Sequence, residues 1–166
     1  MKTILGVDPG LDGAFAWLRR VDKGFELIVR DFPTVVVKKG KTNRREYSIA
    51  ELKQDFQNGY ADHAFIEKVH AMPGQGVTST FTFGEGYGIV RTVCAFLETP
   101  TTLVDPAVWT RVVGLQSGAT KGEHCARAAS LFPGYAQLFR GPRGGLLDGR
   151  ADAALIAWYG IAVLGA

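Results

Sequence analysis

Four acidic side chains stand where a fold could bring them together. Asp8 ends the first apolar run of the chain, and Glu67 ends the short apolar run 64–66. Because open sheets place their ligand chemistry beyond the ends of strands, both acids are expected at such an edge. Asp148 and Asp152 lie four residues apart at the start of a segment with helical character, so both project from one side of that helix.

Three or four carboxylates that converge on one site repel each other unless a cation neutralises them. Carboxylate oxygens without nitrogen or sulfur ligands favour hard ions, Mg²⁺ first, with Mn²⁺ as a substitute. Two such ions about 4 Å apart stabilise the attacking and leaving oxygens of a phosphodiester displacement. That reaction needs no nucleophilic side chain, and the sequence offers no evident Ser/His/Asp or Cys/His arrangement. The acids therefore predict metal-dependent phosphodiester hydrolysis.

Each acid, taken alone, also has a structural alternative. Asp8 precedes a Pro-Gly pair and suits a turn, Glu67 can pair with the lysine that follows it, and Asp148 can cap a helix. Asp152 is different because it lies inside the strongly apolar stretch 151–157. An unpaired acid buried there would be costly, which favours a functional role.

The surrounding pattern predicts an α/β fold with a mixed sheet and helices on both faces. Turn residues divide the first 30 residues into three strands, and their short connections predict antiparallel hairpins. The remaining predicted elements are a helix over 47–58, strands over 64–67 and 101–104, and helices over 79–98, from 106, over 121–131 and over 148–164.

The size and composition fit one domain, residues 1–166, with one core. The apolar fraction is 46% and the charged fraction 21%, as in ordinary globular proteins. No run reaches the roughly 18 apolar residues of a membrane helix, no export signal is visible, and no membrane partner is expected. Cys94 and Cys125 have neither metal-binding nor redox spacing, so we expect reduced, mostly buried thiols in a cytoplasmic protein.

The net charge of +3 is only mildly basic, but its distribution is uneven. Five basic residues fall within eight positions around Gly40, and such a stretch can neutralise several phosphates. The alternative is a solvated loop that keeps the protein soluble. The five residues are Lys38, Lys39, Lys41, Arg44 and Arg45.

Three segments resemble the motifs of RuvC-type Holliday junction resolvases. They are 4–10 (ILGVDPG), 65–70 (FIEKVH) and 150–157 (RADAALIA), which occur in the family's order and at similar separations. Each motif is short, and together they extend over nearly the whole chain. Segments 71–76 (AMPGQG) and 81–84 (FTFG) look most like the compact branch of bacteriophages.

The resemblance implies a ribonuclease H-like fold with a five-stranded mixed sheet and a homodimer that makes paired cuts across a four-way DNA junction. It also implies that Asp8, Glu67, Asp152 and a neighbouring acid hold the metal. The best-known bacterial members have their last two acids three residues apart, whereas position 149 here is Gly. Asp148 is therefore expected to be the fourth ligand, because one helical turn can bring either spacing to one site.

The resemblance also assigns further roles around this site. Lys121 begins a predicted helix where the family carries a basic residue near the scissile phosphate, so it is a candidate catalytic residue. His70 stands near the family's aromatic wedge and either contacts DNA or is an ordinary loop histidine. The other residues expected to contact DNA are Gln75, Arg111, Arg143 and Arg150.

The predicted helix 79–98 carries glycines that destabilise a helix, so a packing role is expected. Gly84 and Gly88 share one face, which suits either the dimer interface or close packing on the chain's own sheet.

Three other functions are compatible with parts of the pattern. The early acidic hairpin also suits ATP-binding proteins of the actin and sugar-kinase type, although these need two such domains. The chain could also be a non-catalytic junction-binding protein, although all the family acids are present. A related metal nuclease acting on flaps or other branched nucleic acid fits as well, because a fold does not decide its substrate.

Overall fold

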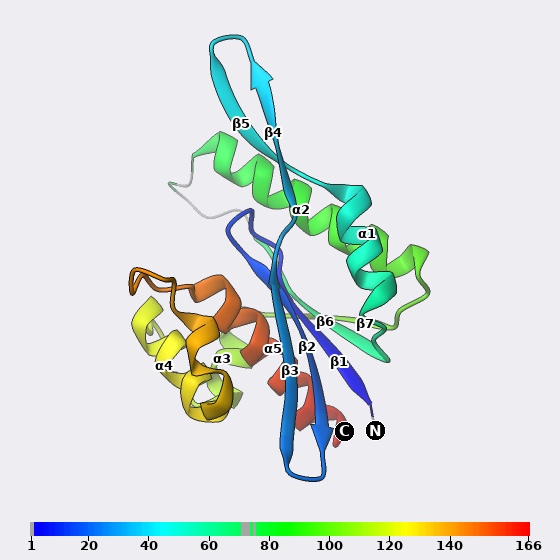
Figure 1. Ribbon diagram of the computed structural model, residues 1–166, viewed down its shortest axis with the longest axis vertical. Helices are drawn as coiled ribbons and strands as arrows, with labels where there is room; N and C mark the ends of the chain where they lie inside the picture. The colour runs from blue at the N-terminus through cyan, green and yellow to red at the C-terminus, as the bar shows by residue number, and fades with distance from the viewer. Residues whose placement is uncertain (1, 71–73, 75) are drawn as a thin grey trace.

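The computed structural model describes residues 2–70, 74 and 76–166. Its centre is a five-stranded sheet in the order β3-β2-β1-β6-β7 (Figure 1). β1 pairs antiparallel with β2 and parallel with β6, so the sheet is mixed, as predicted. The strands are β1 (Thr3–Asp8), β2 (Ala14–Val21), β3 (Gly24–Asp31), β6 (His63–Glu67) and β7 (Thr101–Val104).

Helices cover both faces of this sheet, as the sequence predicted. The first two pack on one face, and α3, α4 and α5 lie on the other (Figure 1). No helix in the described part of the chain is both long and apolar enough to cross a membrane. The helices are α1 (Ile49–Asn58), α2 (Val77–Phe96), α3 (Pro106–Val112), α4 (Lys121–Leu131), the 3₁₀-helix η1 (Pro133–Phe139) and α5 (Asp148–Leu164).

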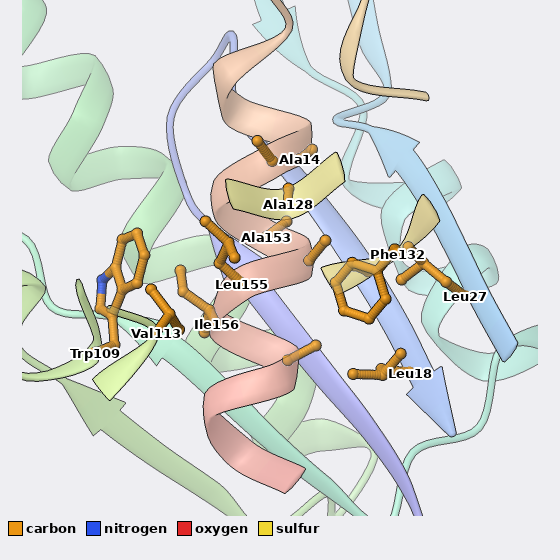
Figure 2. Packing of buried hydrophobic residues seen from close by; sticks show 14 of the residues in the cluster. Ala14, Leu18, Leu27, Trp109, Val113, Ala128, Phe132, Ala153, Leu155 and Ile156 are labelled. Carbon is orange, nitrogen blue, oxygen red and sulfur yellow. The ribbon is translucent and has the colours of Figure 1, made fainter. Parts of the chain in front are cut away.

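The alternation of side chains along the strands divides the interior into two cores. Ile4 and Phe65 point to the face that α5 covers, where they join the apolar cluster of that helix (Figure 2 shows part of it). Leu5 and Ile66 point to the other face, against α1 and α2. Cys94 and Cys125 are buried and unbridged, one in each core, as expected.

A second, two-stranded sheet was not predicted. β4 (Thr34–Lys39) and β5 (Thr42–Tyr47) form a hairpin that extends beyond the rest of the molecule (Figure 1). The basic stretch around Gly40 is therefore part of a two-stranded β-ribbon. The sequence had predicted no strands there. Gly40 has φ of +64° and is the first of two loop residues, a position that favours glycine in tight hairpins.

Candidate active site

The ends of β1 and β6 bring Asp8 and Glu67 side by side. The two strands pair in parallel with Val7 opposite Ile66, so the next pair along is Asp8 and Glu67. Neighbouring strands lie about 4.8 Å apart. Because side chains alternate, Asp8 shares the face of Ile4, and Glu67 shares the face of Phe65. Both acids therefore point to the face of the sheet that α5 covers.

The first turns of α5 carry the other two acids to the same edge. Gly6 lets the helix approach β1, because a Cβ there would collide with the backbone of Ala153 and Ala157. At Gly149, a Cβ would lie 2.5 Å from the carbonyl oxygen of Asp12. That close approach leaves no room for an acid at position 149, so the acid of the first turn is Asp148, at the start of the helix.

The four acids act on each other electrostatically. Burial raises the pKa of Asp8 well above its usual range, and the charges of Glu67, Asp152 and Asp148 raise it further. Burial likewise raises the pKa of Glu67 to about 7, with a further contribution from Asp152. The pKa of Asp152 is raised by burial, against the lowering effect of its hydrogen bond to His124. The structure thus concentrates negative charge in a poorly solvated place.

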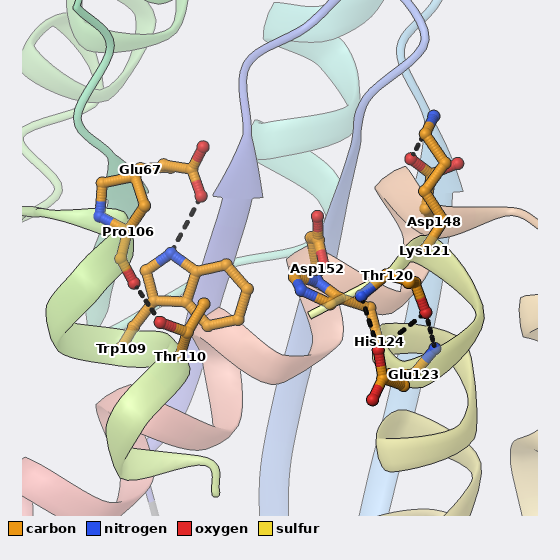
Figure 3. Close-up of polar contacts among 10 residues, drawn as sticks. All are labelled: Glu67, Pro106, Trp109, Thr110, Thr120, Lys121, Glu123, His124, Asp148 and Asp152. Atoms are coloured by element: carbon orange, nitrogen blue, oxygen red, sulfur yellow. Dashed lines mark hydrogen bonds and ion pairs between the residues drawn. The ribbon is translucent and has the colours of Figure 1, made fainter. Parts of the chain in front are cut away.

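Two of these acids have hydrogen-bond partners that sequence reasoning missed (Figure 3). Trp109 on α3 donates its Nε1–H to Oε2 of Glu67 at 2.8 Å. His124 on α4 lies with Nδ1 2.5 Å from Oδ1 of Asp152, and this hydrogen bond raises the pKa of the histidine. Trp109 and His124 hold their acids in place from two different helices on the same face of the sheet.

The third contact involves a residue that was predicted. Nζ of Lys121 lies 2.7 Å from Oδ2 of Asp148 and places a positive charge beside the acids (Figure 3). A capping box fixes the start of α4, with the backbone N–H of Thr120 donating to Glu123 at 2.7 Å and that of Glu123 donating back at 3.3 Å. The Thr-x-x-Glu spacing was readable in the sequence. His124 lies one turn after Lys121 on α4, but its contact with Asp152 depends on how α4 packs against α5.

Two of the four acids, Asp8 and Asp148, border an open groove of about 490 Å³ between the β1–β2 turn, the start of α2 and the starts of α4 and α5. Asp8, Lys121 and Asp148 line it together with Thr82 and Phe83 of α2. The groove is therefore shaped by the segments that carry the predicted catalytic residues.

A second groove, of about 590 Å³, lies between α3 and α4. Arg111 and His124 line it, so the groove reaches the histidine that contacts Asp152.

The donor set fits a hard divalent ion, because it consists of carboxylates whose mutual repulsion such an ion would relieve. In the part of the chain that the structure describes, no three His, Cys, Asp or Glu side chains form a group close enough to share a metal. Trp109, His124 and Lys121 each take one oxygen of an acid. Binding would therefore use the remaining oxygens or turn the carboxylates away from these partners.

The residues predicted to contact DNA lie in several separate parts of the structure. Lys38, Lys39, Lys41, Arg44 and Arg45 are all on the β4–β5 hairpin. His70 lies with Nε2 3.2 Å from Oδ1 of Asp105 at the end of β7, next to the site. Gln75 is outside the described residues.

Arg150 has a clear structural role in addition to its predicted one. Its guanidinium forms a two-fold ion pair with the carboxylate of Asp31, with both distances 2.6 Å, and so ties α5 to the end of β3. Arg143 is exposed in the turn before α5. DNA contact by these arginines stays a prediction.

If the acids carry out the metal-dependent phosphodiester hydrolysis predicted from the sequence, Trp109→Phe is expected to lower its rate about tenfold, at the lower end of the effect of residues that hold metal ligands in place. The phenyl ring keeps most of the buried surface and removes the N–H that holds Glu67. Single-turnover cleavage by the variant would show the loss. Trp17→Phe is a matched control, because the buried Nε1 of Trp17 has no hydrogen-bond partner among the described residues. Equal effects of both changes would contradict a positioning role for Trp109.

The sheet is mixed and has five strands, and acids lie at the ends of β1 and β6 and at the start of α5. This arrangement defines a ribonuclease H-like α/β protein. Comparison with solved structures identifies the type of ribonuclease H-like fold more closely. Two structures of Thermus thermophilus RuvC, the second in complex with a Holliday junction substrate, align with 14% and 11% sequence identity and TM-scores of 0.56 and 0.60. Each alignment covers 98% of this chain and 96% of the RuvC chain.

The yeast mitochondrial Holliday junction resolvase Ydc2 aligns with 17% identity and a TM-score of 0.57, over 94% of this chain and 76% of Ydc2. No protein-family model and no curated protein matches the sequence. The chain therefore has the RuvC-type fold, which confirms the fold predicted from the three motifs.

Proposed function

We propose that this chain is a metal-dependent DNA endonuclease that resolves four-way junctions, acting as one ribonuclease H-like domain over residues 1–166. The observation that carries the proposal is the placement of Asp8, Glu67, Asp148 and Asp152 at one edge of a RuvC-type sheet, where burial and then the charges of the other three acids raise the pKa of Asp8. Two of the four acids line an open groove, and the mutual repulsion of all four costs stability unless a cation neutralises them.

The four acids would hold Mg²⁺ or Mn²⁺, which activates water and stabilises the charge that develops on the phosphodiester. Lys121 carries a positive charge at the rim of the groove, beside Asp148, and is placed to neutralise charge on the phosphate. Trp109 and His124 hold Glu67 and Asp152 in place. The proposal assigns all five predicted catalytic residues, the four acids and Lys121, to this one site.

We further propose that the protein acts as a homodimer, because resolving a junction takes two cuts and each chain brings these acids to one site. A face of α2 is available for the contact. Gly84 and Gly88 have nothing within 4 Å that an added Cβ would meet, and Phe81 is 70% exposed. Gly86 packs against Tyr47 and the backbone of Pro9 instead, so the alternative of packing within the chain applies to that glycine alone. A DNA substrate also supports the expected cytoplasmic location.

The proposal is tested by incubating the protein with four-way, three-way, flap and linear DNA of matched sequence and Mg²⁺. We expect paired cuts in the four-way junction, little cutting of linear DNA, and no cutting when a chelator removes the metal. Manganese is expected to restore cleavage. If flaps are cut faster than junctions, the proposed substrate is wrong. If the protein binds junctions but does not cut them, it is a non-catalytic junction-binding protein.

A further inference from the structure

We propose that the β4–β5 hairpin is a DNA-binding arm, whose tip holds the phosphates of a duplex arm outside the catalytic groove. This inference rests on the proposed function for the identity of the nucleic acid. It assigns different tasks to the two halves of the basic stretch. The arginines near the base fix the hairpin to the walls of the groove, and the lysines at the tip contact DNA.

The hairpin leaves the protein at the edge that carries the acids. It follows β3 in the chain, and the last residue of β3, Asp31, pairs with Ala14. Ala14 in turn pairs with Asp8. The ribbon therefore begins close to the catalytic edge and extends away from the body of the protein (Figure 1).

The base of the hairpin is fixed to the β1–β2 turn, which lines the groove. Nη1 of Arg45 lies 2.7 Å from Oδ1 of Asp12, and Nη2 donates to the carbonyl oxygen of Leu11 at 3.0 Å. The buried hydroxyl of Tyr47 donates to the carbonyl oxygen of Pro9 at 3.2 Å. These contacts set the direction of the hairpin relative to Asp8.

The other arginine fixes the hairpin to the opposite wall of the groove. Nη2 of Arg44 donates to Oγ1 of Thr82 on α2 at 3.1 Å. Thr82 lines the same groove as Asp8 and Asp12. The hairpin is thus held by contacts to both walls of the groove.

Two lysines near the tip, Lys38 and Lys41, carry charge that no other described residue neutralises. Lys38 and Lys41 are exposed, and neither has a hydrogen bond or an ion pair with another described residue. The hairpin has five basic residues against the single acid Glu46, which lies near the base opposite Val35. Unpaired lysines on a projecting ribbon can bind phosphates without first losing a protein contact.

The dimensions and the electrostatics both favour duplex DNA as the partner. Six residues per strand at about 3.4 Å each give a ribbon about 20 Å long, and the major groove, about 12 Å wide, admits a two-stranded ribbon. The cluster of Asp8, Glu67, Asp148 and Asp152 repels the DNA that it must cut. Positive charge outside the cluster is therefore needed to hold the substrate, and the hairpin supplies it.

The experiment measures junction binding without divalent metal, by fluorescence anisotropy over a range of salt concentrations. For Lys38→Ala/Lys41→Ala we expect affinity to fall about tenfold or more, and the slope of log affinity against log salt to become shallower by about 2. The control is Lys2→Ala/Lys23→Ala, which removes the same charge at the opposite end of the sheet and is expected to change the slope much less. Lys38→Gln/Lys41→Gln repeats the test with polar side chains, in case alanine promotes pairing of the free strand edges.

Cleavage over a range of protein concentrations separates this inference from the proposed function. The lysine variant is expected to need more protein than the wild type for the same cleavage, in proportion to its loss of junction affinity. If the lysine variant binds junctions with the same salt slope as the wild type, the proposed DNA-binding arm is wrong, and the nuclease proposal is unaffected. If the wild type cuts no DNA but the slope still changes, the arm stands and the nuclease proposal is wrong. A hairpin variant that loses binding to another protein instead, with DNA binding intact, would overturn the arm as well.

Discussion

Asp8→Asn and Glu67→Gln are each expected to reduce cleavage in Mg²⁺ by about 10³-fold or more, because each removes a charged oxygen donor from the centre of the acidic cluster. Asp8 is the sharper test. Its pKa is raised by burial and by the charges of three other acids, so its carboxyl interacts with every other acid of the site. Single-turnover cleavage of a four-way junction measures the effect directly.

The same variants are expected to keep junction binding and stability. Asn at position 8 removes a buried charge that its neighbours repel, so the metal-free variant should unfold at the wild-type temperature or above it. Mg²⁺ should raise the unfolding temperature of the wild type by mass action and that of the variant much less, which reports metal binding independently of cleavage. Cleavage by either variant at the wild-type rate would refute the assigned metal site.

The sequence predicted the position of the acids because strand ends and side-chain alternation are local properties. An apolar run that stops at Asp8 and another that stops at Glu67 identify two strand ends without knowledge of the tertiary structure. A period of two then places both side chains on one face, and the i, i+4 spacing adds Asp148 and Asp152. The α/β architecture followed from the same periodicities.

The β4–β5 hairpin was not predicted because its strands bury no alternating apolar face. The run Val35-Val36-Val37, with the two-residue loop Gly40-Lys41 after it, is a recognisable hairpin signal. Its side chains are largely exposed, with Val36 at 68%, so the strands lack the buried alternating face by which the other strands were found.

Trp109 and His124 could not be predicted for a different reason. Each contacts an acid that is distant in the sequence, Glu67 or Asp152, and the contact depends on how α3 and α4 pack on the sheet and on α5. Local patterns identify these helices and their caps, but they do not give the rotation of one helix against another. Such partners of catalytic residues become visible only in the tertiary structure.

Gly149→Ala is expected to lower the free energy of unfolding by about 1–3 kcal/mol, the usual effect of overpacking, and to slow cleavage about 10²-fold. The added Cβ would lie 2.5 Å from the carbonyl oxygen of Asp12 and 2.8 Å from Cα of Gly13. Both are backbone atoms of the β1–β2 turn, so the start of α5 must move. A displacement of about 1 Å at a catalytic group can cost 10²-fold in rate. Denaturant unfolding and single-turnover cleavage measure the two effects.

A double variant decides whether the fourth acid depends on its place in the helix. Asp148→Asn/Gly149→Asp moves the acid to the three-residue spacing of the bacterial resolvases that this sequence resembles. Because the close approach at Gly149 forbids a side chain there, we expect the double variant to cut no faster than Asp148→Asn alone and to be less stable than it. Wild-type cleavage by the double variant would mean that α5 can withdraw from the β1–β2 turn at little cost. In that case Gly149 would not explain why this chain carries its acid one position earlier.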